Sequence, residues 1–180
     1  LRRPARRNGP GMGMKETVME LLQSADSSRL ERLAADEPRA VRHLVGRLWD
    51  SDRRVRQLAA AAVGAAAAAH RELGRDLLKR LVWALNDESA TNGVYGLAAI
   101  GEIGARDPEL ARDFLGPVAG LAGDAGLRSA IYRALGRVAD TAPELVEPLL
   151  AELGTWLDRE DSEQVAAFGE LEAKVGHGAA

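Results

Sequence analysis

The chain has 180 residues, a formal net charge of −3 and no cysteine. The lack of cysteine excludes thiol catalysis, iron–sulfur clusters and zinc ribbons. No run approaches the roughly 18 apolar residues that a membrane span needs, and no apolar stretch follows the basic N-terminus as in a signal peptide. We therefore expect a cytoplasmic protein with no membrane partner.

Residues 1–13 are predicted to form a disordered basic tail, because they combine glycine and proline with four arginines. These arginines are Arg2, Arg3, Arg6 and Arg7. Without them, 20 basic residues face 27 acidic ones, a balance of −7, which disfavours nonspecific binding to nucleic acid. Met12 and Met14 are both candidate natural starts, so whether the tail belongs to the native protein stays open.

From residue 14 onward the chain repeats itself. A motif of alanine, a large apolar residue and glycine occurs four times, and its glycines are 37, 35 and 33 residues apart. The glycines are Gly64, Gly101, Gly136 and Gly169. A second marker, a leucine followed within three residues by aspartate, precedes each glycine. A period in the thirties indicates stacked helical hairpins.

Five hairpins are predicted in chain order, at about 14–36, 38–73, 75–106, 108–141 and 143–176, followed by a short tail at 177–180. Pro38, Pro108 and Pro143 mark joins between helices, since proline is accepted in a first helical turn and ends the preceding helix. The first hairpin is a degenerate copy of the other four. The predicted fold is therefore all-α, a right-handed α-solenoid of about five such hairpins.

Each hairpin consists of a first helix, a turn and a second helix. The turns are rich in aspartate, asparagine and serine, which cap helix N-termini. Apolar residues beside each repeated glycine are predicted to form the core stripe. They are Val63, Ala66, Ile100, Ile103, Leu135, Val138, Phe168 and Leu171. The glycines themselves are expected to let neighbouring helices approach closely, which would offset their poor helix propensity.

The second helices resemble those of HEAT repeats. The resemblance rests on Val55-Arg56 followed by Ala59 and Val63-Gly64, and on Leu127-Arg128 followed by Ala134 and Leu135-Gly136. It covers residues 38–176 well and 14–37 weakly, and it is closest to the bacterial HEAT-like repeats also found in phycobilin lyases. It implies a right-handed solenoid with the second helices on a concave face, and binding more often than catalysis.

Two hairpins depart from the family pattern. Gly93 and Asp161 stand where the family has arginine, so the arginine-to-aspartate ladder that the resemblance implies is expected to be broken there.

The residues for common catalytic and metal sites are missing. His43, His70 and His177 lie in different hairpins, and none has a second ligand three or four residues away, as a helical metal site would. There is no Gly-x-Ser-x-Gly elbow and no phosphate-binding glycine loop with its lysine. We therefore predict no enzyme activity, no cofactor and no metal.

The third hairpin concentrates unusual polar and aromatic residues. Trp83 and the turn with Asn86, Asp87 and Glu88 are followed by Asn92 and Tyr95. Tryptophans at the ends of first helices are usually core or half-core, so a binding role for Trp83 is the less frequent alternative. The acidic turns admit two interpretations as well: a docking edge for a basic partner or a cation, or helix caps. We favour caps.

The concave face is predicted from the register of the repeat. The residue after the glycine is Ala65, Glu102, Arg137 and Glu170 in turn. We expect Glu102, Arg137 and Glu170 to form an ion ladder between hairpins, each exposed pair contributing about 0–1 kcal/mol. Arg133 and Tyr132 are assigned to the same face.

These observations favour a noncatalytic scaffold that binds a peptide or protein on its concave face or its acidic turn edge. The predicted partner-binding residues are Trp83, Asn86, Asp87, Glu88, Asn92, Tyr95, Glu102, Tyr132, Arg133 and Arg137. The alternatives are an accessory or lyase-like protein for a bound chromophore and, less favoured, a HEAT-like nucleic-acid-binding protein. Weak self-association through the terminal hairpins is a further expectation, because end repeats expose a packing face.

Overall fold

A computed structural model describes residues 13–86 and 90–178. Within these ranges every regular element is a helix, so the protein is all-α, as predicted. None of the helices described is both long and apolar enough to cross a bilayer. The predicted tail at 1–13 lies outside the described residues, except for Gly13, whose carbonyl accepts a backbone hydrogen bond from Thr17 in the first helix.

The described helices follow one another in five consecutive pairs, each an outer segment followed by an inner helix. The pairs are α1 (Met14–Gln23) and α2 (Ser27–Asp36); η1 (Pro38–Ala40), α3 (Val41–Val45) and η2 (Gly46–Trp49), then α4 (Arg53–Ala69); α5 (Arg71–Leu85), then η3 (Ala90–Tyr95) and α6 (Gly96–Arg106); α7 (Pro108–Gly120) and η4 (Leu121–Gly123), then α8 (Arg128–Ala139); and α9 (Pro143–Val146), η5 (Glu147–Leu149) and α10 (Leu150–Thr155), then α11 (Ser162–Gly178).

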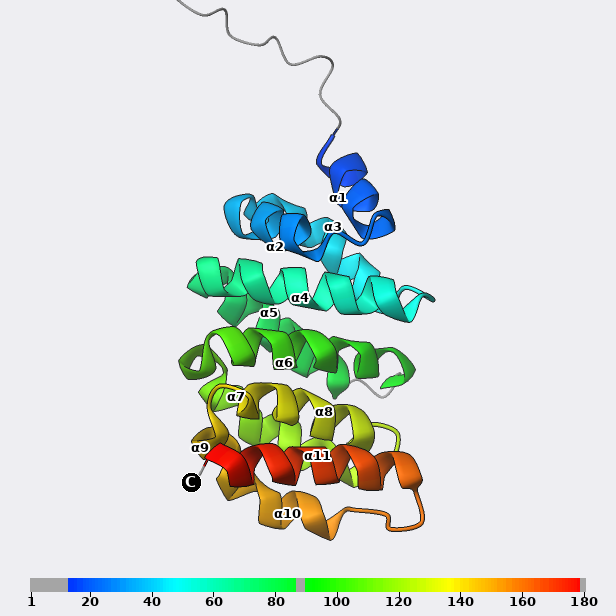
Figure 1. Cartoon of the computed structure of the whole chain (residues 1–180), viewed down its shortest axis with the longest axis vertical. Coiled ribbons are helices and arrows are strands. Elements are labelled where there is room, and N and C mark those ends of the chain that lie inside the picture. Colours follow the sequence, from blue (N-terminus) through cyan, green and yellow to red (C-terminus); the bar gives the residue numbers. More distant parts are fainter. Residues whose placement is uncertain (1–12, 87–89, 179–180) are drawn as a thin grey trace, which may run out of the picture.

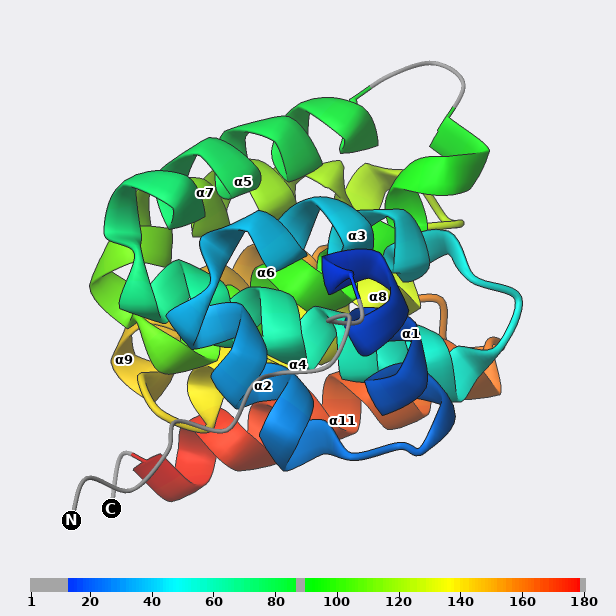
Figure 2. The same cartoon turned by 90° about the horizontal axis from the view of Figure 1, so that it is seen from above.

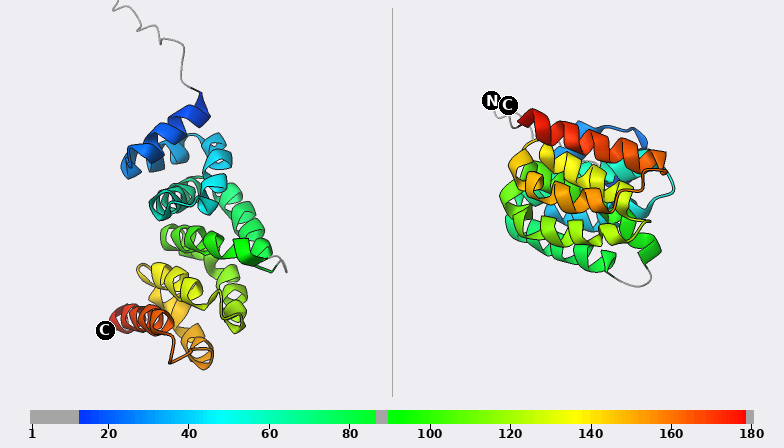
Figure 3. Two further views of the ribbon diagram at one scale, coloured as in Figure 1. Left: turned by 90° about the vertical axis from the view of Figure 1, so that its right-hand side faces the viewer. Right: turned by 90° about the horizontal axis from the view of Figure 1, so that it is seen from below.

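The pairs stack in chain order and form two layers. In the inner layer, α2, α4, α6, α8 and α11 each pack against the next, and α4, α6, α8 and α11 lie one below another in Figure 1. The outer layer contains α3, α5, α7 and the α9–α10 segment (Figure 2). The stack is bowed, with the inner layer on its concave side (Figure 3).

Two boundaries differ from the prediction. The third pair begins at Arg71 rather than at residue 75, because His70 ends α4 with φ −131° and ψ 80°. The His70 ring nitrogen Nε2 also donates to the carbonyl oxygen of Ala35 at 2.8 Å, which ties this turn to the first pair. At the other end, α11 continues to Gly178, two residues past the predicted end of the fifth hairpin at 176, and the rest of the predicted tail lies outside the described residues.

The caps and the core stripe follow the sequence pattern. Carboxylates of Asp26, Asp52, Asp107 and Asp161 accept backbone N–H groups in the first turns of α2, α4, α7 and α11. All eight residues of the predicted stripe are buried. Burial of such side chains is the main favourable contribution to folding, at about 25 cal/mol per Å² of apolar surface.

The repeated glycines do not all serve the same purpose. A Cβ atom on Gly64 would lie 2.9 Å from the backbone of Glu102, and one on Gly101 would lie 2.9 Å from the carbonyl oxygen of Ala134. These two glycines allow α4, α6 and α8 to approach closely, as predicted. A Cβ on Gly136 would meet only an ordinary contact at 3.8 Å, and one on Gly169 would meet nothing within 4 Å.

Alanine at these positions should therefore have opposite effects. Gly101→Ala is expected to lower the free energy of unfolding by about 1–3 kcal/mol, because α6 and α8 must separate to admit the methyl group. Gly169→Ala should raise it by up to about 1 kcal/mol, because alanine favours the helix and no contact is disturbed. Urea denaturation measures both. Equal effects of the same sign would contradict the close-approach explanation.

Candidate functional site

A groove of about 520 Å³ crosses the inner layer over α4, α6, α8 and the start of α11. Its floor consists largely of small side chains, with Ala60 on α4, Ala98 on α6, and Ala130 and Ala134 on α8. These alanines leave open a space that longer side chains would fill. The groove is lined by Arg53, Arg56, Gln57, Ala60, Val94, Tyr95, Ala98, Glu102, Ala130, Arg133, Ala134, Arg137 and Glu163.

The charges along the groove are unevenly paired. Arg133 on α8 forms an ion pair with Glu163 on α11 at 2.8 Å, and both side chains are largely exposed. Arg137 on α8 pairs with Glu102 on α6, with Arg137 Nε 2.7 Å from the carboxylate. Four arginines and two glutamates are among the lining residues described, so the groove is positive although the chain as a whole is negative.

Arg56 and Tyr95 form the aromatic end of the groove. The Arg56 guanidinium lies over the Tyr95 ring, 4.6 Å from its centroid, a geometry that attracts a cation to an aromatic face. Arg56 Nη1 also donates to the carbonyl oxygens of Asp50 at 2.7 Å and Ser51 at 3.0 Å. These bonds fix the guanidinium against the turn before α4, while the Tyr95 ring remains 39% exposed.

Arg128 repeats this arrangement in the fourth pair. It donates to the carbonyl oxygens of Ala122 at 2.7 Å and Gly123 at 3.1 Å, at the same sequence separations as in Arg56. Neither arginine forms an ion pair with an aspartate in the described chain, so backbone carbonyls replace the arginine-to-aspartate ladder that the resemblance implied. Gly93 packs against the backbone of Ala84 and Leu85, and Asp161 caps α11.

Charged side chains beside the groove form a chain of ion pairs across the inner layer, which we call the Glu102 network. Its members are Glu31 on α2, Glu102 and Arg106 on α6, Arg137 on α8, Asp140 after α8 and Lys174 on α11. Glu102 binds both Arg106 and Arg137, and Arg106 reaches Glu31 at 2.8 Å across α4. The network thus connects four of the inner helices.

The Glu102 carboxylate lies at the centre of this network, and its side chain is only 18% exposed. Burial would raise its pKa, but hydrogen bonds from Arg137 and Arg106 outweigh burial and hold the pKa below its ordinary value. Glu102 is therefore ionised at neutral pH. A carboxylate held in this state binds cations and does not act as a general acid.

The predicted ladder of Glu102, Arg137 and Glu170 forms only in part. The Glu102–Arg137 pair is confirmed, whereas no ion pair joins Arg137 to Glu170 in the described part of the chain. Arg137 instead takes Asp140, three residues further along, as its second carboxylate at 3.0 Å.

Four predicted site residues lie together in the groove, namely Tyr95, Glu102, Arg133 and Arg137. Tyr132 does not, and its assignment to the binding face is wrong. Its side chain is 0% exposed, it packs edge-on against Phe168, and its hydroxyl donates to the Leu153 carbonyl at 3.2 Å. A residue enclosed in this way belongs to the core of the last two pairs.

The other predicted residues lie elsewhere. Trp83 and Asn86 are at the C-terminal end of α5 in the outer layer and do not line the groove. Trp83 is 71% exposed, so the expectation of a core or half-core position is wrong for it. Asp87 and Glu88 lie outside the described residues, as does the side chain of Asn92, although its backbone belongs to η3.

Three charged lining residues were missed as site candidates: Arg53, Arg56 and Glu163. The repeated glycine was used to place only residues close to it, and Arg53 and Arg56 lie a full two turns or more before Gly64. Their i, i+3 spacing directly after the cap Asp52 places both on one face of α4, and this was the available signal.

The aspartates of the acidic turns accept hydrogen bonds from nearby backbone. Asp52 and Asp161 cap α4 and α11, as predicted, whereas three other aspartates bind N–H groups within the turns themselves. Asp50 accepts the N–H of Asp52, Asp124 that of Gly126, and Asp158 that of Glu160. The hydrogen bond from the Asp52 N–H lowers the pKa of Asp50.

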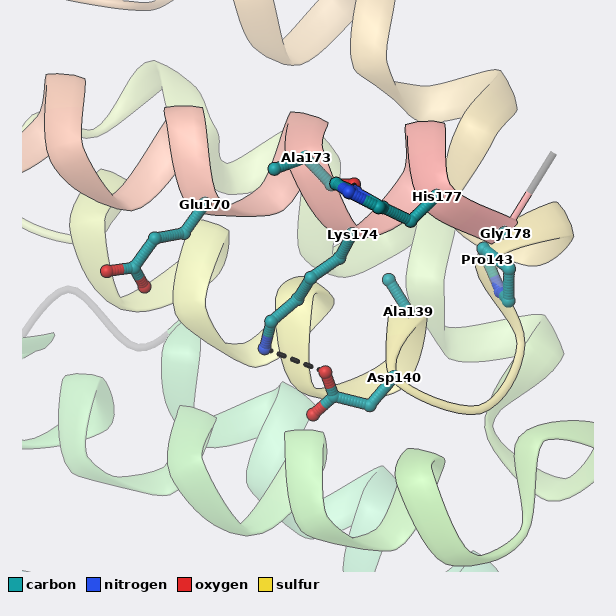
Figure 4. A pocket seen from close by; sticks show the side chains of 8 residues that line it. All are labelled: Ala139, Asp140, Pro143, Glu170, Ala173, Lys174, His177 and Gly178. Carbon is teal, nitrogen blue, oxygen red and sulfur yellow. Dashed lines mark hydrogen bonds and ion pairs between the residues drawn. The ribbon is translucent and has the colours of Figure 1, made fainter. Parts of the chain in front are cut away.

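A second hollow, of about 610 Å³, lies between the end of α8 and α11 (Figure 4). In it Lys174 points toward Asp140 and pairs with it at 2.9 Å, while Glu170 and His177 lie on either side of Lys174 along α11. Its one lysine is thus neutralised within the protein. No three histidine, aspartate or glutamate side chains gather as metal ligands would anywhere in the described ranges. The groove is therefore the stronger candidate site.

Comparisons of the chain with protein-family models, with curated proteins and with solved structures gave no match.

Proposed function

We propose that this chain is a noncatalytic interaction scaffold that binds a peptide or protein partner in the groove of its inner layer. The observation that carries the proposal is the groove itself: an alanine floor bordered by arginines from α4 and α8 and by the exposed ring of Tyr95. Arginine and tyrosine are the residue types that most often anchor protein partners.

The proposal includes the architecture, a right-handed α-solenoid of five HEAT-like hairpins. It is supported by the packing of successive inner helices in chain order and by the equivalent carbonyl contacts of Arg56 and Arg128. Stacked repeats of this kind present an extended surface, and such surfaces commonly bind other proteins. The lowered pKa of Glu102 makes its carboxylate a weak base, which supports a binding role over proton transfer.

A photo-crosslinking amino acid at position 98 tests this function. Ala98 is exposed and lines the groove, while Lys79 is an exposed position on α5 in the outer layer. In cells that express the protein natively, we expect a discrete covalent adduct with a polypeptide from position 98 and none from position 79. Adducts from both positions alike, or from neither, would contradict the proposal.

The polypeptide found in the adduct should also bind the purified chain. Ala98→Trp fills the groove and is expected to weaken that binding at least about tenfold, whereas Lys79→Trp should leave it unchanged. Isothermal titration calorimetry measures both. An absorbance band beyond that of protein in the natively purified chain would instead favour the chromophore alternative.

A further inference from the structure

We infer that the groove recognises an acidic segment of its partner, with a carboxylate bound by Arg53 and Arg56 beside the ring of Tyr95. This inference rests on the proposed function and specifies the chemistry of the partner. The two halves of the groove differ in net charge, although both contain arginine.

The half formed by α8 and α11 is neutralised within the protein. Arg133 pairs with Glu163 and Arg137 pairs with Glu102. In the half formed by α4, neither Arg53 nor Arg56 lies within ion-pair distance of a carboxylate of the described chain. The carboxylate of Asp50, which is paired with Arg47 at 3.2 Å, acts on Arg56 at longer range. The positive charge of the groove is therefore concentrated at the α4 end, where it is open to a ligand.

The donors of Arg56 remain available in that half. A guanidinium has five N–H donors, and both hydrogen bonds that Arg56 makes come from Nη1. Its Nε and Nη2 atoms have no partner among the described residues. Because the guanidinium is held in place by two carbonyls and the Tyr95 ring, a carboxylate meets donors that are already oriented.

The surface around these arginines suits a polypeptide. Ala60, Val94 and Ala98 make an apolar floor beside the exposed Tyr95 ring, which fits an apolar side chain next to the bound acidic one. The basic N-terminal residues of this chain have the same sign as the groove and do not complement it.

Nucleic acid fits the groove less well. Binding to a phosphate backbone depends on neutralising several phosphates, and among the described lining residues only Arg53 and Arg56 are arginines outside an ion pair. The charge of the chain outside its first 13 residues is −7, which repels a polyanion that extends beyond the groove.

The test uses the full chain and two variants with the same change in charge. Arg53 and Arg54 are both exposed and lie in the first turn of α4, but only Arg53 lines the groove. Glutamate is favourable in the first turn of a helix, so Arg53→Glu and Arg54→Glu should both fold. Circular dichroism and thermal unfolding check this.

The probes are a library of random twelve-residue peptides displayed on phage and a fluorescein-labelled oligothymidine of 20 nucleotides. We expect the peptides selected on the wild-type chain to be enriched in aspartate and glutamate over the input library. For the best of them, fluorescence anisotropy should show binding that weakens with added NaCl. Arg53→Glu should weaken it at least about tenfold and Arg54→Glu less than about twofold.

The outcomes separate this inference from the function on which it rests. Selection of neutral or basic peptides whose binding Ala98→Trp abolishes would overturn the acidic partner and leave the scaffold intact. Equal losses in Arg53→Glu and Arg54→Glu would overturn the role of Arg53. Binding of the oligothymidine with the same dependence on Arg53, without any selected peptide, would overturn the inference in favour of nucleic acid. If no peptide is enriched and position 98 gives no adduct, both proposals are wrong.

Discussion

Replacing Tyr132 with alanine is expected to lower the free energy of unfolding by about 3–5 kcal/mol. The side chain is fully buried between α8, α10 and α11, with its ring 5.1 Å from that of Phe168. Alanine would leave a cavity at this junction and would also leave the Leu153 carbonyl without the hydroxyl that donates to it. Urea denaturation followed by circular dichroism measures the loss.

Tyr132→Phe is the matched control. It keeps the packing and removes only the hydrogen bond, so a loss of about 1 kcal/mol is expected. Peptide binding in the groove should be the same for Tyr132→Phe as for the wild type, because the hydroxyl does not reach the groove surface. A loss of peptide binding in Tyr132→Phe with little change in stability would contradict this prediction and show that Tyr132 belongs to the binding face.

Glu102→Gln is expected to lower the free energy of unfolding by about 1–3 kcal/mol at pH 7. The substitution removes the negative charge shared by Arg106 and Arg137, and hydrogen bonds to charged groups in such half-buried sites contribute about this much. Glu163→Gln is the matched control. Its pair with Arg133 is exposed, with 65% of the Glu163 side chain accessible, so a change within about 0.5 kcal/mol is expected.

The effect of Glu102→Gln should depend on pH. Because the pKa of Glu102 is lowered on folding, its ionised form stabilises the native state above the ordinary value of 4.5, and this contribution is lost as pH falls through the lower, folded pKa. The difference in unfolding free energy between wild type and Glu102→Gln should therefore be largest at neutral pH and shrink below pH 4.5. A difference that stays constant down to pH 3 would show that the charge of Glu102 is not the cause.

Much of the fold could be predicted because it depends on features that recur in the sequence. The residues flanking each repeated glycine are buried, and aspartates cap the inner helices α2, α4 and α11. The glycines look equivalent in sequence, but their surroundings depend on how closely each pair of helices packs. A Cβ on Gly169 meets no described atom within 4 Å, and no local pattern distinguishes this glycine from Gly101.

Site residues could be predicted only where counting along a single helix from the repeated glycine was enough to place them. Counting from the glycine placed Glu102, Arg133 and Arg137 correctly in the groove. The same register could have corrected Tyr132, because Leu97, the residue four before the glycine in the preceding pair, is apolar and buried. The contact of Arg56 with Tyr95 joins the second and third pairs through residues that are distant in sequence, and it becomes visible only once these pairs are stacked.

The Arg106–Glu31 ion pair is expected to change the order in which the stacked helix pairs unfold. In a simple linear array each repeat is coupled only to its immediate neighbours, so the ends can fray one unit at a time. Here the first pair shares a bond with the third, over the alanine-rich α4 between them. Detaching α2 therefore removes contacts from two repeats at once, and the N-terminal half is expected to unfold more cooperatively than a chain of nearest-neighbour contacts would.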